Sequence, residues 1–186
     1  MTFNIPNSLS LLRIILIPIM IGLFFTNTEN NRTIAAMLFF LAAITDYLDG
    51  YMARNLKQHT SFGEFIDPVA DKLLVVVILM LLMSENNSVY FIIPSIIIIT
   101  REFLVVSIRQ RLAELGNKIT IKVSYISKIK TAIQMTALFL LLYQKNTYGI
   151  NIYHVGVVAL QMASLLTLIS FIIYVKKSWN GIINQH

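Results

Sequence analysis

The chain has no cysteine and little charge, because Asp, Glu, Lys and Arg make up only 13% of its 186 residues. The absence of cysteine excludes disulfides, thiolate metal ligands and cysteine nucleophiles. The scarcity of charge argues against a soluble domain, in which about 25% of residues are charged. Hydrophobic residues make up 56% of the chain and the mean hydropathy is +0.72, which is typical of a membrane protein.

The hydrophobic residues form six long runs, and roughly 20 apolar residues suffice for a helix to cross a bilayer core about 30 Å thick. The runs lie near residues 8–26, 33–53, 68–84, 89–108, 129–143 and 153–175. We therefore expect an all-α integral membrane protein with six transmembrane helices in one domain, residues 1–186. The first run contains Arg13 and has no small-residue cleavage site, so we expect it to stay in the mature protein.

Lys and Arg are distributed unevenly between the two sides that this topology defines. All of the 15 except Arg32 and Lys145 lie on the side that carries both termini. Because cytosolic loops are rich in Lys and Arg, both termini are expected in the cytosol. This rule and anionic lipid headgroups account for the net charge of +6, so we expect no nucleic-acid partner.

All four aspartates lie in one segment, TDYLDGYMARNLKQHTSFGEFIDPVADK, residues 45–72. The spacing of Asp46 and Asp49 puts them on one helix face at the end of the second run, and Asp67 and Asp71 share a face at the start of the third. A short loop between these runs would make the two helices antiparallel neighbours. We therefore expect the four carboxylates to converge near the cytosolic surface.

Four converging carboxylates would repel one another in a site of low dielectric unless cations are bound there. Two divalent cations would balance the charge, and a ligand set made only of oxygens favours Mg²⁺ or Mn²⁺ over zinc. Gly50 would allow a ligand to approach closely, and Arg54 is placed one turn further on to contact a phosphate. Gly63 is expected to permit a turn between the two Asp pairs.

Each part of this pattern has a structural explanation when taken alone. Asp67 followed by Pro68 is typical of a helix N-cap and its first helical position. Asp46 and Asp49 would be explained by ion pairs with nearby cations inside a membrane protein. The joint pattern D-x2-D-G-x2-A-R-x8-G-x3-D-x3-D, however, fixes eight positions over 26 residues. At roughly one in 20 per position, chance agreement is on the order of 10⁻¹⁰ per window.

The joint pattern resembles, without a departure, the signature of the CDP-alcohol phosphotransferase family. The resemblance implies the CDP-alcohol phosphotransferase fold, usually a homodimer, in which the hydroxyl of an alcohol displaces CMP from a CDP-linked lipid or alcohol. It also implies two divalent cations, Mg²⁺ or Mn²⁺, and Asp71 as the catalytic base. The implied metal ligands are Asp46, Asp49, Asp67 and Asp71. The implied CDP-binding residues are Asp46, Gly50, Ala53, Arg54 and Gly63.

Two longer stretches, NIPNSLSLLRIILIP and REFLVVSIRQRLAELGNKITIKVSYISKIKTAIQ, resemble one bacterial branch of the family, the phosphatidylglycerophosphate synthases. An acceptor that carries a phosphate needs cations that are not paired to the Asp cluster. The candidates are Arg101, Arg109, Lys128 and Lys130, each of which has an alternative role as an anchor at the cytosolic surface. We assign Arg111, Lys118 and Lys122 to solvent or anionic lipid. Glu102 is expected to pair with a nearby Arg, and His59 to be a solvated loop residue.

With the charge distribution, the resemblance therefore implies a multi-pass enzyme of the bacterial plasma membrane whose active site faces the cytosol. It would transfer the phosphatidyl group from CDP-diacylglycerol to sn-glycerol 3-phosphate and release CMP, with membrane lipids and a second copy of the chain as partners. One alternative is a sibling enzyme that uses inositol phosphate or serine. A divalent-cation transporter is disfavoured because the aspartates lie at helix ends and not at the midplane. A scaffold without catalysis would have no use for four converging carboxylates.

Overall fold

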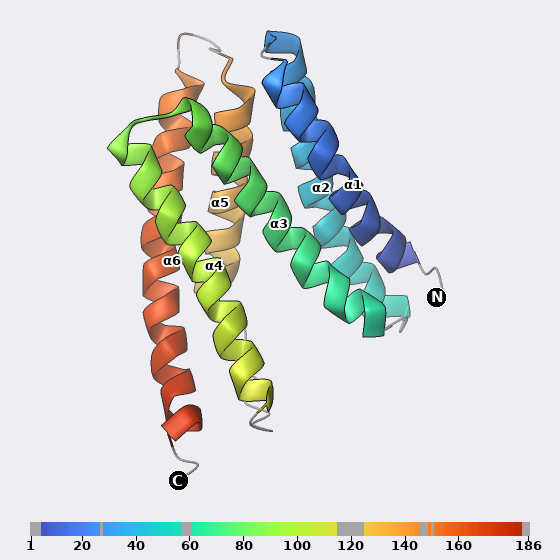
Figure 1. Ribbon diagram of the computed structural model, residues 1–186, viewed down its shortest axis with the longest axis vertical. Helices are drawn as coiled ribbons and strands as arrows, with labels where there is room; N and C mark the ends of the chain where they lie inside the picture. The colour runs from blue at the N-terminus through green and yellow to red at the C-terminus, as the bar shows by residue number, and fades with distance from the viewer. Residues whose placement is uncertain are drawn as a thin grey trace. The chain divides into compact units, whose positions relative to one another are not determined.

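A computed structural model describes residues 5–26, 28–56, 61–114, 125–145, 149 and 151–183, some of them by the backbone alone. These residues form six helices (Figure 1). The helices are α1 (Ile5–Phe25), α2 (Glu29–Leu56), α3 (Ser61–Glu85), α4 (Val89–Glu114), α5 (Tyr125–Tyr143) and α6 (Ile152–Ile183). Each helix contains or overlaps one of the six predicted apolar runs, and the all-helical prediction is confirmed for the residues described.

The third helix begins much earlier than its apolar run. Because α3 starts at Ser61, Asp67 and Pro68 lie inside the helix, and the interpretation of Asp67 as an N-cap is wrong. Gly63 also lies inside α3, where it is buried, so the turn expected at this residue is wrong too. Glycine and proline both disfavour helix interiors, and contacts with another helix override that preference here. One such contact is a hydrogen bond from the Ser10 hydroxyl in α1 to Asp67 Oδ1.

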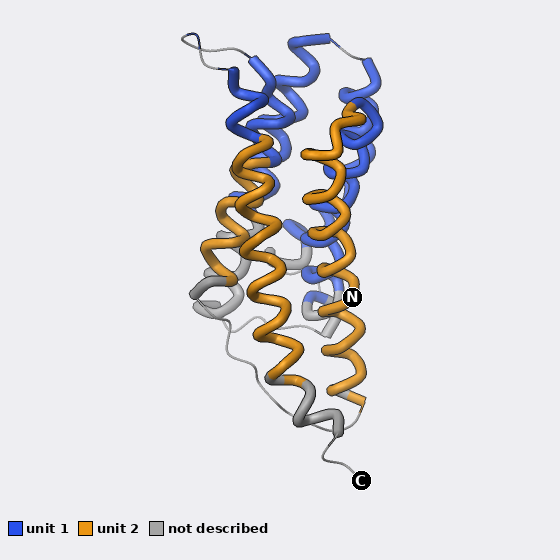
Figure 2. Tube along the Cα trace, turned by 90° about the vertical axis from the view of Figure 1, so that its left-hand side faces the viewer, with its two compact units in different colours: residues 1–85, 138–156 blue, residues 86–137, 157–186 orange. Residues whose placement is uncertain are grey.

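The chain divides into two compact units, which Figure 2 distinguishes by colour. Unit 1 comprises Met1–Glu85 and Leu138–Gly156, and therefore holds α1, α2, α3, the end of α5 and the start of α6. Unit 2 comprises Asn86–Ala137 and Val157–His186, with α4 and most of α5 and α6. All four aspartates belong to unit 1, and the four candidate acceptor-binding cations belong to unit 2.

Unit 1 is organised around α1, which packs against both α2 and α3 (Figure 1). Met20 and Phe24 of α1 are almost fully buried. The buried residues of α2 include three alanines, whose small side chains allow helices to approach closely. Buried side chains recur at helical spacing along both α2 and α3. They are Ala35, Ala36, Phe39 and Ala42 in α2 and Leu74, Ile78, Leu79 and Leu82 in α3.

Arg32, near the start of α2, ties together several segments of unit 1. Its guanidinium forms an ion pair with Glu85 at the end of α3 and donates a hydrogen bond to Gln144 Oε1 at 2.7 Å, just beyond α5. It also lies over the Phe24 ring, 5.1 Å from the ring centroid. This end of unit 1 is therefore fixed by directional contacts as well as by apolar packing.

Unit 2 has a buried stripe along α4 and a more polar one along α6. The buried residues of α4 recur every three to four positions or at multiples of that spacing, as Phe91, Ser95, Ile98, Val105 and Leu112. Glu102 falls on the same stripe. The buried residues of α6 include small hydroxyl side chains among the apolar ones: Leu160, Ala163, Ser164, Thr167 and Ser170. The interior of unit 2 is therefore partly polar.

Within the described residues, three helices contain a stretch long and apolar enough to cross a membrane. These stretches are Ser8–Phe25 in α1, Val89–Leu112 in α4 and Ile152–Lys176 in α6, with mean hydropathies of 2.3, 2.1 and 2.2. Large apolar side chains such as Ile15, Tyr90 and Val158 are more than half exposed on these helices. Water would be a poor solvent for so much apolar surface, and lipid tails a good one. The protein is therefore embedded in a membrane.

Gly156 of α6 packs closely on Leu141 of α5, and enlarging it should destabilise unit 1. A Cβ at this position would lie 2.8 Å from Leu141 Cγ and 3.2 Å from the Leu141 backbone nitrogen. We expect Gly156→Ala to lower the free energy of unfolding by about 1–3 kcal/mol, since overpacking forces neighbouring atoms to shift. Thermal unfolding of the purified protein in detergent measures this change.

Gly22→Ala is the matched control, because a Cβ built there has no described heavy atom within 4 Å apart from its chain neighbours and the backbone of its own helix. It should leave stability unchanged or raise it by up to about 1 kcal/mol, as expected for alanine in place of glycine inside a helix. Equal unfolding temperatures for the two variants would contradict the close packing of Gly156.

Candidate active site

The first half of the motif lies in the last part of α2. Asp46, Asp49, Gly50, Ala53 and Arg54 all belong to this helix, which continues to Leu56. The helical spacing predicted for Asp46 and Asp49 is therefore confirmed. The side chains of these five residues lie outside the described part of the structure, and so do residues 57–60 with His59.

The second half of the motif lies in the early part of α3. Asp67 and Asp71 are one helical turn apart on the same face, and both are partly buried. Asp67 Oδ1 accepts a hydrogen bond from the Ser10 hydroxyl of α1. Since α1 packs against α2 as well as α3, one helix contacts both of the helices that carry the motif.

The convergence of all four carboxylates stays a prediction, because only Asp67 and Asp71 have described side chains. Among the residues whose side chains are described, no group of three or more His, Cys, Asp or Glu could hold a metal ion. The two that are described agree with the expected donor chemistry, since both contribute carboxylate oxygens. Oxygen ligands of this kind suit Mg²⁺ or Mn²⁺.

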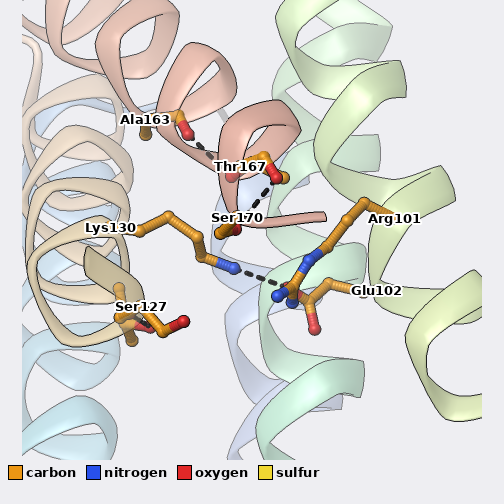
Figure 3. Close-up of polar contacts among 8 residues, drawn as sticks. Arg101, Glu102, Ser127, Lys130, Ala163, Thr167 and Ser170 are labelled. Atoms are coloured by element: carbon orange, nitrogen blue, oxygen red, sulfur yellow. Dashed lines mark hydrogen bonds and ion pairs between the residues drawn. The ribbon is translucent and has the colours of Figure 1, made fainter. Parts of the chain in front are cut away.

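A cluster of charged side chains lies inside unit 2, where α4 and α5 face each other (Figure 3). Arg101 Nη1 donates to Glu102 Oε1 at 2.9 Å, and Lys130 Nζ donates to the same oxygen at 2.8 Å. The side chains are 13%, 12% and 5% exposed for Arg101, Glu102 and Lys130. The predicted pairing of Glu102 with an Arg is confirmed, and the second partner, Lys130, was not predicted.

The polar surroundings of this cluster come mainly from α6. Ser170 donates its hydroxyl proton to the Thr167 carbonyl at 2.9 Å, and Thr167 donates to the Ala163 carbonyl at 2.6 Å (Figure 3). Both hydroxyls bond within their own helix, so each keeps acceptor capacity for another donor. Gln134 of α5, one turn beyond Lys130, is buried as well. The cluster therefore lies in polar surroundings.

The other candidate cations of the acceptor site are more exposed. Arg109 of α4 and Lys128 of α5 are both exposed, so their alternative role as anchors at the membrane surface stays open. Arg111 is exposed and pairs with Glu114 at 3.2 Å, in agreement with its assignment to solvent. Lys118 and Lys122 lie outside the described residues.

Comparison with known proteins gives the decisive observation. The family model described as CDP-alcohol phosphatidyltransferase matches residues 3–176. The chain belongs to the CDP-alcohol phosphatidyltransferase family. The match extends far beyond the Asp motif, so the resemblance found in that motif is confirmed. Membership in the family also argues against the alternative of a divalent-cation transporter, in which the four aspartates would form the ion pathway.

Individual relatives match this CDP-alcohol phosphatidyltransferase over nearly its whole length. A protein of Wigglesworthia glossinidia brevipalpis is 43% identical over 182 residues, covering 98% of each chain. One of Haemophilus influenzae is 40% identical over 185 residues, covering 100% of this chain and 98% of its own. One of Shigella flexneri serotype 5b is 38% identical and covers both chains fully. All three are named CDP-diacylglycerol–glycerol-3-phosphate 3-phosphatidyltransferase.

Two residues near the motif were missed by reasoning from the sequence. Ser10 and Arg13 of α1 are buried and belong to the hydrogen-bonded surroundings of Asp67. The available signal was Arg13, a charged residue inside an apolar run, which usually has a specific partner in a membrane protein. The positive-inside rule alone accounts for a cation at this end of the run, so the sequence gives no reason to expect a contact with the motif.

Proposed function

We propose that the protein transfers the phosphatidyl group of CDP-diacylglycerol to sn-glycerol 3-phosphate, giving phosphatidylglycerophosphate and CMP. The observation that carries this proposal is the end-to-end similarity to relatives named for this reaction, at 37–43% identity. The unbroken Asp motif is consistent with it. A sibling reaction with inositol phosphate or serine is less well supported, because the relatives cited here are named for glycerol 3-phosphate.

In the proposed reaction, the acceptor hydroxyl attacks the phosphorus atom that bears the diacylglycerol group. The bond from this phosphorus to the oxygen of CMP breaks, and CMP leaves with the bond's electron pair. Asp71 accepts the proton of the hydroxyl. Arg54 contacts the diphosphate, while Gly50, Ala53 and Gly63 leave space for the cytidine nucleotide. The lipid tails stay in the bilayer, which explains why the motif lies on membrane helices.

Two divalent cations, Mg²⁺ or Mn²⁺, would be held by the four carboxylates of the motif, which are Asp46, Asp49, Asp67 and Asp71. Bound there, they would neutralise charge on the diphosphate and lower the pKa of the acceptor hydroxyl. The donor set fits these cations, since Asp67 and Asp71 present carboxylates one turn apart on α3. The remaining charge of the substrates must be met by Arg and Lys side chains.

The phosphate of the acceptor would be bound by Arg101 and Lys130, with Arg109 and Lys128 at the exposed edge of the site. Arg101 and Lys130 both donate to Glu102 Oε1, which brings the positive charge of two side chains together. In partly buried surroundings such a charge attracts an anion strongly. This cluster therefore offers a phosphate-binding site that an acceptor without a phosphate would leave unused.

The distribution of charge supports a complete topology for this single catalytic domain. We infer six membrane spans, with both termini and the active site on the cytosolic side of the bacterial plasma membrane. We also infer a homodimer, on the resemblance to the family alone. A cytosolic active site gives water-soluble glycerol 3-phosphate direct access to the lipid headgroup.

Arg101→Ala should weaken binding of the acceptor and spare binding of CDP-diacylglycerol. Without Arg101, the cluster loses one of its two cationic groups and the guanidinium donors that would contact the phosphate. A charge-assisted hydrogen bond is worth about 1.5–3 kcal/mol, so the KM for glycerol 3-phosphate should rise about 10- to 100-fold. Steady-state kinetics with each substrate varied in turn measure both constants.

Arg111→Ala is the control for Arg101→Ala, because Arg111 lies on the same helix but is 64% exposed. It should leave both KM values unchanged. An unchanged KM for glycerol 3-phosphate in Arg101→Ala would contradict the acceptor site, whereas the reaction itself is tested by mass spectrometry of the lipid product. Failure to find phosphatidylglycerophosphate would contradict the proposed function.

A further inference from the structure

A chain of hydrogen bonds runs from α1 to one of the motif aspartates. Arg13 Nη2 donates to Ser10 Oγ at 3.3 Å, and the Ser10 hydroxyl donates to Asp67 Oδ1. Ser10 and Arg13 lie one turn apart on α1 and are 0% and 1% exposed, while Asp67 comes from α3. The contact therefore joins two helices of unit 1 at a predicted metal ligand.

The direction of these bonds is set by the chemistry of the hydroxyl. A serine hydroxyl has one proton, and Ser10 commits it to the carboxylate while its lone pairs face the Arg13 donor. The buried serines Ser95, Ser164 and Ser170 donate to carbonyls of their own helix, as Ser95 does to the Phe91 carbonyl at 2.8 Å. The Ser10 proton instead holds a side chain on another helix. Such a bond restricts the orientation of the Asp67 carboxylate.

Burial also separates Arg13 from an ordinary surface anchor. Arg and Lys side chains that serve as anchors extend their charged groups into the headgroup region, but Arg13 is nearly completely enclosed. A buried guanidinium is stable when it is hydrogen-bonded near negative charge. Its charge lies two hydrogen bonds from Asp67, and so it offsets part of the negative charge of that carboxylate.

We propose that Ser10 and Arg13 are positioning residues that hold Asp67 in the orientation required for a divalent cation. This inference rests on the proposed function of Asp67 as a metal ligand and adds the groups that orient it. Hydrogen bonds to the ligands of a metal typically contribute 10- to 100-fold in metal affinity or activity. The role is distinct from contact with substrate, so it should affect metal binding directly.

The test is the affinity of the purified full-length protein for Mn²⁺, measured by electron paramagnetic resonance without lipid substrate. Ser10→Ala should raise the Mn²⁺ dissociation constant about tenfold or more and leave the KM for glycerol 3-phosphate unchanged. Ser10→Thr keeps a hydroxyl and should restore an affinity within about threefold of the wild type. Ser95→Ala removes an equally buried hydroxyl that bonds its own helix and should bind Mn²⁺ like the wild type.

Two results would overturn the inference, and they are distinguishable. Wild-type Mn²⁺ affinity in Ser10→Ala would show that the metal site exists without needing this hydrogen bond. Absence of Mn²⁺ binding by the wild-type protein would overturn the metal site itself and the positioning role with it. An equal loss of affinity in Ser95→Ala would also contradict the inference, since the effect would then follow from any buried serine.

Discussion

Replacing Asp71 by Asn should lower kcat at least about 1,000-fold, as measured by CMP release. The change removes the proposed base for the acceptor hydroxyl, and general-base catalysis typically contributes 10²- to 10⁴-fold. It also removes one negative charge from the proposed set of metal ligands. Asn is nearly isosteric with Asp, so the protein should still fold and its unfolding temperature in detergent should be preserved.

Mn²⁺ provides a control that does not depend on turnover. A cation that binds only the folded protein raises its stability according to its concentration and dissociation constant. Saturating Mn²⁺ should therefore raise the unfolding temperature of the wild type by more than that of Asp71→Asn. Full activity in the variant would exclude Asp71 as the base, and an identical response to Mn²⁺ would exclude it as a ligand.

Replacing Glu102 by Leu should strongly destabilise unit 2. Glu102 Oε1 accepts hydrogen bonds from both Arg101 and Lys130, and its loss would leave the buried Lys130 and the partly buried Arg101 without this carboxylate. Removing one partner of a buried ion pair costs about 3–5 kcal/mol. For a chain of this size, that corresponds to a fall in unfolding temperature of roughly 6–20 °C, which thermal unfolding in detergent measures.

Glu114→Leu is the matched control, because Glu114 is 51% exposed and pairs with an exposed Arg111 on α4. Exposed pairs contribute about 0–1 kcal/mol, so this variant should unfold close to the wild-type temperature. Adding Lys130→Met to Glu102→Leu should recover part of the stability, since one of the two cations that contacted Glu102 is removed. Equal stabilities of Glu102→Leu and Glu114→Leu would contradict the structural role of the cluster.

The sequence predicted the helices well because hydrophobic runs dominate it. The start of α3 was not predicted, since SFGEFID before Pro68 is polar and contains glycine, features that favour a loop when only local propensity is considered. Packing on α1 and the bond from Ser10 to Asp67 involve residues far apart in sequence. No local pattern contains that information.

The Asp motif was predicted more completely than the charge cluster. The aspartates were recognisable because their spacing matches the signature of the family to which the chain belongs, and a single sequence contains that spacing. The charge cluster was only partly recognisable. The pairing of Glu102 with an Arg was expected from the sequence. The bond from Lys130 to Glu102 was not, because Lys130 lies on another helix and the bond depends on how α4 and α5 pack. Ser10 was missed because a single serine in a helix carries no signal of its own.

The measurement that tests the central claim most directly is CMP release by the purified wild-type protein from CDP-diacylglycerol. Glycerol 3-phosphate, inositol phosphate and serine are offered in turn, with Mg²⁺ or Mn²⁺ and then with a chelator. We predict release with glycerol 3-phosphate and a divalent cation, and none with the other acceptors or with the chelator. Release that persists in the chelator, or that depends on inositol phosphate or serine instead, would contradict the proposed function.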